Sequence, residues 1–154
     1  MIGGEKLLTT YFLNCIAQEI FGHPETSKIP YDYYIALSST EPKLDGSGVT
    51  EPSIDTGYQR VRIDNSHLFF GEINNDRVLN HDKAYFPESI KPWYDISYYA
   101  IFDMPTDGNL LMFGKLDSIM NVPIKTIVSI PIETLGISVN NSVGGDINEY
   151  QYKY

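Results

Sequence analysis

The stretch from Pro92 to Leu116 reads PWYDISYYAIFDMPTDGNLLMFGKL and predicts the central β-hairpin of the fold. Successive side chains of a strand point to opposite faces. The first strand should therefore present one apolar face made of Ile96, Tyr98, Ala100 and Phe102. Tyr99 and Ile101 make the opposite face apolar as well. We therefore expect a strand that is covered on both sides.

A turn separates this strand from the next apolar run. It contains Pro105 and the pair Asp107-Gly108. Proline presets one backbone angle of a turn and glycine accepts positive φ, so the chain can reverse here. The return strand should begin at Leu110. The hairpin determines the fold and contains no catalytic chemistry.

Further short strands are predicted on both sides of the hairpin, rich in tyrosine and β-branched residues and bounded by turn formers. They cover residues 31–38, 58–63, 83–86, 124–132 and 135–139, and a polar hairpin is predicted over 67–80. The total is about seven to nine strands, a number typical of sandwiches and barrels. Between the first two lies a long polar loop, 39–57, which we expect to be mobile and to contact partners.

Residues 5–21 predict one amphipathic helix. Apolar residues recur there at three- and four-residue steps, and the stripe consists of Leu8, Phe12, Cys15 or Ile16, and Ile20. We expect this stripe to pack on a sheet face or on a neighbouring subunit. Cys15 is interpreted as a small buried hydrophobe rather than a nucleophile. The predicted fold is mainly β, an antiparallel β-sandwich or barrel with one N-terminal α-helix.

The length of 154 residues favours a single domain. We assign residues 1–139 to this domain and residues 140–154 to a polar C-terminal tail without a core pattern. The tail contains Tyr150, Tyr152 and Tyr154.

The formal net charge of −9 argues against binding of nucleic acid and of anionic membranes. No run of 18 apolar residues or signal-peptide core is found, so we expect synthesis in a host cytoplasm. The sequence also lacks a Walker motif, a GxSxG motif and paired zinc-ligand spacing. We therefore expect no enzyme activity, no cofactor and no metal. A hydrolase with paired carboxylates stays open as a rival, because 20 acidic residues do not exclude it.

Several side chains are candidates for partner contacts, because they are aromatic or charged residues on predicted loops, strand ends or the tail. They are Glu51, Tyr58, Arg60, Arg62, Trp93, Tyr150, Tyr152 and Tyr154. Arg60 and Arg62 share one strand face, which either binds an anion or, more commonly, is solvated or ion-paired. A carbohydrate-binding module is an alternative, in which Trp93 and surface tyrosines stack on a host surface glycan.

The order of these elements resembles a family of small virion proteins of tailed phages and prophages, commonly labelled tail-fibre or minor structural proteins. The resemblance covers roughly residues 7–139. Its most specific parts are YIALSSTEPKLDGSGVTEPS over 34–53 and GYQRVRI over 57–63. It continues through Asn80, Phe86-Pro87, Trp93 and the turn with its return strand from Asp107 to Gly114.

The resemblance implies a non-enzymatic structural component of a virion, at the tail, baseplate or fibre attachment, with other virion proteins as partners. A head-decoration protein is an alternative within the same class. Short strands leave edges that proteins usually cover, so we also expect a closed homo-oligomer or a ring position.

Overall fold

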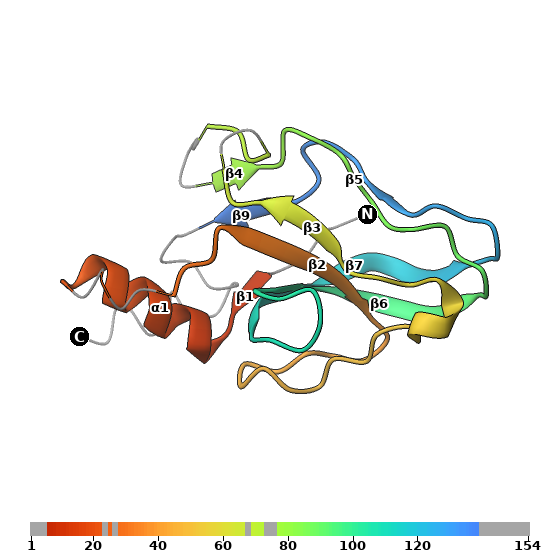
Figure 1. Ribbon diagram of the computed structural model, residues 1–154, viewed down its shortest axis with the longest axis horizontal. Coiled ribbons are helices and arrows are strands. Elements are labelled where there is room, and N and C mark those ends of the chain that lie inside the picture. The colour runs from red at the N-terminus through yellow and green to blue at the C-terminus, as the bar shows by residue number, and fades with distance from the viewer. Residues whose placement is uncertain (1–5, 23–24, 26–27, 67–68, 73–76, 139–154) are drawn as a thin grey trace.

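The computed structural model describes residues 6–22, 25, 28–66, 69–72 and 77–138 (Figure 1). Within this part of the chain, the strands outnumber the single α-helix. The helix is α1 (Thr10–Ile20), and a short 3-10 helix is η2 (Ile54–Thr56). The strands are β1 (Lys6–Leu8), β2 (Asp32–Ser38), β3 (Val61–Asp64), β4 (Arg77–Leu79), β5 (Ala84–Tyr85), β6 (Trp93–Phe102), β7 (Leu110–Val122), β8 (Ser129–Ile130) and β9 (Gly136–Ser138).

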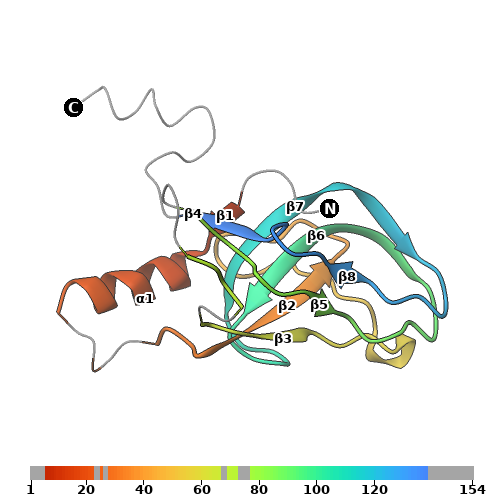
Figure 2. The same cartoon turned by 90° about the horizontal axis from the view of Figure 1, so that it is seen from above.

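Five strands form an antiparallel sheet in the order β1-β7-β6-β2-β3. Two short antiparallel pairs, β4–β9 and β5–β8, lie against this sheet (Figure 2). The main core lies between them, because it joins Ile35 and Ile101 of the large sheet to Ala84, Ile130 and Leu135. The predicted fold class is confirmed. The arrangement resembles a sandwich, and the large sheet ends at β1 and β3 without closing into a barrel within the described residues.

The predicted central hairpin is confirmed as β6 and β7, which are paired from Trp93–Val122 to Phe102–Leu110. Both faces of β6 are covered, as expected. Tyr99 and Ile101 belong to the main core, and Ala100 and Phe102 to a second apolar cluster with residues of β7.

The predicted alternation along β6 fails at Ile96, which lies in the main core with Tyr99 rather than on the face of Ala100. Register shifts on both sides of Ile96 explain the difference. From Trp93 to Ile96 β6 advances three residues while β7 advances two, from Val122 to Met120, so β6 contains an extra residue there. From Ile96 to Tyr98 the extra residues lie in β7, between Met120 and Lys115. Such a bulge changes the face to which the next side chain points.

A glycine on β7 makes room for a buried tyrosine of β6. Tyr99 pairs with Gly114 across the hairpin. A Cβ atom at Gly114 would lie 2.5 Å from the Tyr99 hydroxyl oxygen. The Tyr99 ring therefore fills the space that a side chain would need, and Tyr99 is 1% exposed.

The helix begins at Thr10 rather than at Glu5, because Lys6–Leu8 forms β1 and pairs with β7. Thr9 caps the helix by accepting a hydrogen bond from the Phe12 amide. Phe12 and Cys15 are buried, as predicted. The predicted stripe is wrong at both ends, since Leu8 is part of a strand and Ile20 is 66% exposed.

The polar hairpin predicted over 67–80 is present as an antiparallel bridge between Phe70 and Asn80. Two predicted strands are shorter than expected: β3 covers residues 61–64 where 58–63 was predicted, and β8 covers 129–130 within 124–132. β4 pairs with β9, because Asn80 binds the C-terminal segment. The side-chain Nδ2 of Asn80 donates to the Pro131 carbonyl oxygen at 2.8 Å, and its Oδ1 accepts from the backbone amide of Leu135 at 2.8 Å.

The loop 39–57 is held by its own hydrogen bonds, which corrects the expectation that it is mobile. The Ser39 amide donates to the Thr50 carbonyl oxygen at 3.0 Å, and the Lys43 amide donates to the Ser47 carbonyl oxygen at 2.8 Å. The loop therefore folds back on itself and ends in η2. The predicted tail, residues 140–154, lies outside the described residues.

Candidate functional site

The predicted contact residues of the loop and of β6 meet near η2, at the end of the molecule opposite α1 (Figure 1). Glu51 and Arg60 form an ion pair there. The Arg60 Nε donates to Glu51 Oε1 at 3.0 Å, and Nη2 donates to Oε2 at 2.8 Å. The Arg60 side chain is 7% exposed and that of Glu51 is 24% exposed. Paired nitrogen–oxygen contacts of this kind fix the orientation of both groups.

The same guanidinium fastens the turn between β6 and β7. Its Nη1 donates to the carbonyl oxygens of Met104 at 2.9 Å and Asp107 at 2.8 Å. The guanidinium carbon lies 3.6 Å from the centroid of the Phe102 ring, a cation–π contact. Arg60 therefore connects three segments that are distant in the sequence.

Tyr58 extends this network into the core. Its hydroxyl donates to Glu51 Oε1 at 2.8 Å and accepts from the Leu37 amide at 2.9 Å. Tyr58 is 5% exposed. Burial raises the pKa of its hydroxyl, and the neighbouring Glu51 carboxylate raises it further. The hydroxyl is thus kept protonated as a donor to Glu51.

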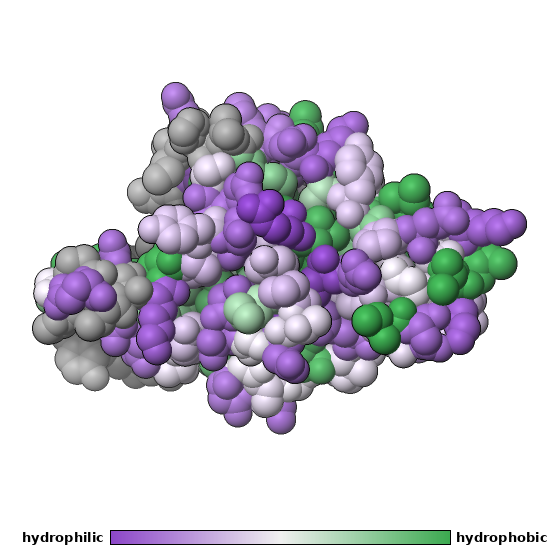
Figure 3. All heavy atoms as spheres, viewed as in Figure 1, coloured by the Kyte–Doolittle hydropathy of each residue, from purple (hydrophilic) through white to green (hydrophobic). Residues whose placement is uncertain are grey.

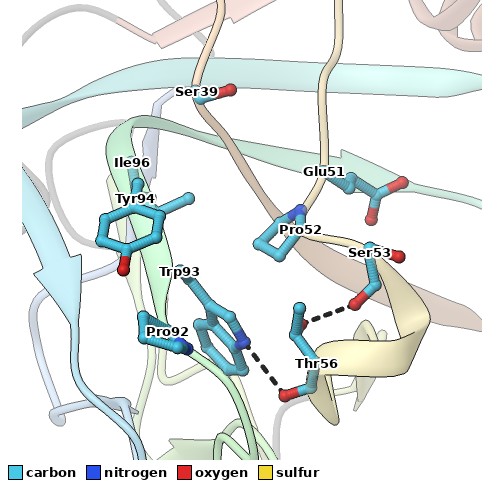
Figure 4. Close-up of a pocket in the computed structure, with 9 residues that line it drawn as sticks. All are labelled: Ser39, Glu51, Pro52, Ser53, Thr56, Pro92, Trp93, Tyr94 and Ile96. Atoms are coloured by element: carbon cyan, nitrogen blue, oxygen red, sulfur yellow. Dashed lines mark hydrogen bonds between the residues drawn. The ribbon is translucent and has the colours of Figure 1, made fainter.

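Trp93 is the aromatic centre of this end of the core. Its ring meets that of Tyr58 edge-on at 5.4 Å and that of Phe86 at 6.3 Å between centroids. The indole nitrogen points towards the Thr56 carbonyl oxygen at 3.4 Å (Figure 4). With 1% exposure, Trp93 has no open face for a sugar ring. The carbohydrate-binding alternative therefore loses Trp93 and rests on exposed tyrosines alone.

Two shallow pockets flank this network and share Glu51 and Pro52. The first, of about 200 Å³, is lined by Ser39, Glu51, Pro52, Ser53, Thr56, Pro92, Trp93, Tyr94 and Ile96 (Figure 4). The second, of about 360 Å³, is lined by Glu51, Pro52, Ile54, Tyr58, Gln59, Arg60, Pro105, Thr106 and Asp107. Glu51, which lines both pockets, and Arg60, which lines the second, are bound to each other, and Arg60 is bound to the turn between β6 and β7, so this part of the pocket wall is rigid.

Comparison with known families identifies the class of protein. A family model described as podophage GP4 fiber I protein gp80 matches residues 8–138. The chain belongs to this phage fibre protein family. The match extends from β1 to β9, and it confirms the resemblance to tailed-phage virion proteins. No curated protein was found to match.

Membership of a phage fibre family makes this fibre protein a virion component. Among the residues that the structure describes, no group of three or more His, Cys, Asp or Glu side chains is arranged to hold a metal ion. No described helix combines the length and apolar character needed to cross a membrane.

The structure brings four of the predicted contact residues of the fibre protein together and places a fifth, Arg62, elsewhere. Glu51, Tyr58, Arg60 and Trp93 form one cluster, in which Tyr58 and Trp93 are buried. Arg62 lies on β3, is 60% exposed and pairs with Asp32 at 2.8 Å and Asp64 at 3.1 Å. This is the solvated, ion-paired face that the sequence favoured.

The three tyrosines 150, 152 and 154 lie outside the described residues. Two residues that complete the site, Met104 and Asp107, were not predicted from the sequence. The Met104 and Asp107 carbonyl oxygens bind Arg60 through the backbone, and nothing in their side chains signals this role.

The buried tyrosines predict a loss of stability at alkaline pH. Burial raises the pKa of Tyr33 to about 12, and it also raises the pKa of Tyr99. An unfolded tyrosine titrates near pH ~10. Below that pH both states keep the hydroxyl neutral, and the contribution of these tyrosines to the free energy of unfolding is fully present. It is lost as the pH rises from ~10 through the folded pKa, because the unfolded chain releases protons that the native chain retains.

Urea unfolding measured at about pH 8 and about pH 11 should therefore show a lower free energy of unfolding at the higher pH. Tyr33→Phe should reduce this difference. Tyr31→Phe is the matched control, because Tyr31 is 92% exposed and should leave the difference unchanged. Equal stability of the wild type at both pH values would contradict the burial of these hydroxyls.

Proposed function

We propose that the chain is a non-enzymatic structural component of a tailed-phage virion, at the tail, baseplate or fibre attachment. The observation that carries the proposal is the family match over residues 8–138, which includes nearly all of the described fold. The geometry of the site supports it. Glu51, Tyr58 and Arg60 are bound to one another and to the backbone, an arrangement that stiffens a surface.

Attachment at the tail is favoured over a head-decoration role by the family description, which names a fibre protein. Its partners are then other virion structural proteins. We further propose that residues 1–139 are one domain and that residues 140–154 are a docking tail, with Tyr150, Tyr152 and Tyr154 as its contact side chains.

Deletion of residues 144–154 tests the docking tail. The free energy of unfolding should change by less than about 1 kcal/mol, because the sequence of the tail lacks the apolar pattern of a core element. Incorporation into purified particles should fall several-fold, measured by quantitative immunoblotting of particles from phage encoding the variant. A full-length chain with Tyr150, Tyr152 and Tyr154 changed to serine separates side-chain contacts from tail length.

Two results would contradict the docking tail. A truncated chain that unfolds would make these residues part of the fold. A truncated chain that enters infectious particles at the wild-type level would show that docking does not need them.

A further inference from the structure

Two loops are tied together by one buried serine at the end of the molecule that carries η2. Ser89 is fully buried, and its hydroxyl donates to the Pro123 carbonyl oxygen at 2.5 Å and accepts from the Thr126 amide at 3.1 Å. The Ser89 carbonyl oxygen accepts from the Lys125 amide at 2.7 Å. The segment before β6 is therefore fixed to the link between β7 and β8.

The 3-10 helix joins the same unit. The Ile90 amide donates to the Thr56 carbonyl oxygen at 2.9 Å, and Trp93 points its indole nitrogen at the same oxygen. Gly57 lies so close to the Glu88 carbonyl oxygen that a Cβ atom there would be 2.8 Å away. The segments 54–57, 88–94 and 123–127 thus form one rigid surface over the buried Trp93.

This rigid surface exposes large apolar side chains, which we call the isoleucine platform. Its members and their exposed fractions are Ile54 75%, Ile90 65%, Tyr94 65%, Ile124 53% and Ile127 56%. Figure 3 shows strongly hydrophobic groups at this end of the molecule with hydrophilic groups among them. A surface that mixes exposed apolar side chains with polar groups is typical of a protein–protein contact, which as a whole is about as apolar as the rest of a protein surface.

The charges on these segments indicate which partner fits. They are Asp55, Glu88, Lys91 and Lys125, two acidic and two basic, so the formal sum is zero. The whole chain carries −9, and two copies of it therefore repel each other in general. At the platform this repulsion is absent. Asp55 and Lys91, whose side chains are 57% and 59% exposed, form an ion pair within the chain at 2.5 Å and so place one charge of each sign on this surface.

We propose that the isoleucine platform binds the platform of a second copy of the chain about a two-fold axis. A two-fold contact places the same patch on both sides, so it must be self-complementary. The platform meets this condition, because apolar side chains face apolar side chains and the Asp55–Lys91 pair of each copy presents one charge of each sign to the same pair of the other copy. This inference concerns the chain by itself and goes beyond its place in the virion.

Sedimentation velocity of the full-length chain over a range of concentrations tests the proposal. The wild type should associate to dimers, and Ile90→Glu should raise the dissociation constant by at least about tenfold, as substitution of a central contact does. The matched control is Ile20→Glu. Ile20 is 66% exposed on α1, at the opposite end of the molecule, and its substitution should leave the dissociation constant unchanged.

A charge exchange gives a sharper test, because it restores binding only between different chains. Asp55→Lys and Lys91→Asp should each weaken self-association, since each places like charges opposite one another. A mixture of the two variants should form heterodimers, because positions 55 and 91 are both basic in the Asp55→Lys chain and both acidic in the Lys91→Asp chain. Both positions are exposed, so the fold of each variant should be retained.

Three results would overturn the proposal. The first is a wild type that stays monomeric at every concentration. The second is an Ile90→Glu chain that dimerises like the wild type, and the third is a mixture that associates no better than its components. A monomeric wild type whose Ile90→Glu variant fails to enter particles would assign the platform to another virion protein.

Discussion

Replacing Trp93 with alanine should lower the free energy of unfolding by about 3–5 kcal/mol, the usual cost of removing a large buried aromatic ring. Trp93 is 1% exposed and contacts the rings of Tyr58 and Phe86. The substitution also removes the donor that points at the Thr56 carbonyl oxygen. The substitution leaves a cavity beneath η2, so it should destabilise the packing of this whole end of the core.

Urea unfolding of Trp93→Ala and of its neighbour Tyr94→Ala measures this effect with an internal control. Tyr94 is 65% exposed, and its substitution should change the free energy of unfolding by no more than about 0.5 kcal/mol. Equal, small effects at the two positions would mean that Trp93 is not the centre of the aromatic core.

Replacing Glu51 with alanine should lower the free energy of unfolding by about 3 kcal/mol. The Arg60 side chain is 7% exposed and would lose its only described carboxylate partner. A cation left buried without an anion is more costly than the loss of an exposed pair. The expected loss of unfolding free energy is at the lower end of the range for buried ion pairs, because the Glu51 side chain is 24% exposed.

Asp55→Ala is the matched control for Glu51→Ala, because it breaks the exposed pair with Lys91 on the same surface. Exposed pairs contribute little, so its unfolding curve should overlay that of the wild type. The double variant Glu51→Ala, Arg60→Met should be more stable than Glu51→Ala alone, since it removes the unpaired cation. A double variant no more stable than Glu51→Ala would contradict the electrostatic explanation.

The central hairpin could be predicted because its signal is local. Alternating apolar residues and a Pro–Asp–Gly turn lie within 92–116, and they pair with each other in β6 and β7. The face of Ile96 could not be predicted, because the register shifts on both sides of it are set by the pairing of β6 with β7.

Elements that depend on distant partners were predicted less well. Lys6–Leu8 continues the helical pattern of α1 but forms β1, since the neighbouring strand β7 supplies its hydrogen bonds. β4 pairs with β9 through contacts made by Asn80, far along the chain. Local periodicity contains no information about either partner.

The sequence identified the residues of the site but not their relationship. Glu51, Tyr58, Arg60 and Trp93 were each expected to contact partners, and they contact one another instead. The return of the loop through η2 brings them together, and the turn carbonyl oxygens of Met104 and Asp107 complete the arrangement. This convergence is a property of the tertiary fold.

The position of the chain in purified particles is the most direct test of its role as a fibre-associated virion protein. Electron microscopy of particles labelled with gold-conjugated antibodies against the chain measures this position. The expected result is label at the tail, in the region where the fibres attach. Label over the head surface, or purified particles free of the chain, would contradict a structural role at the tail.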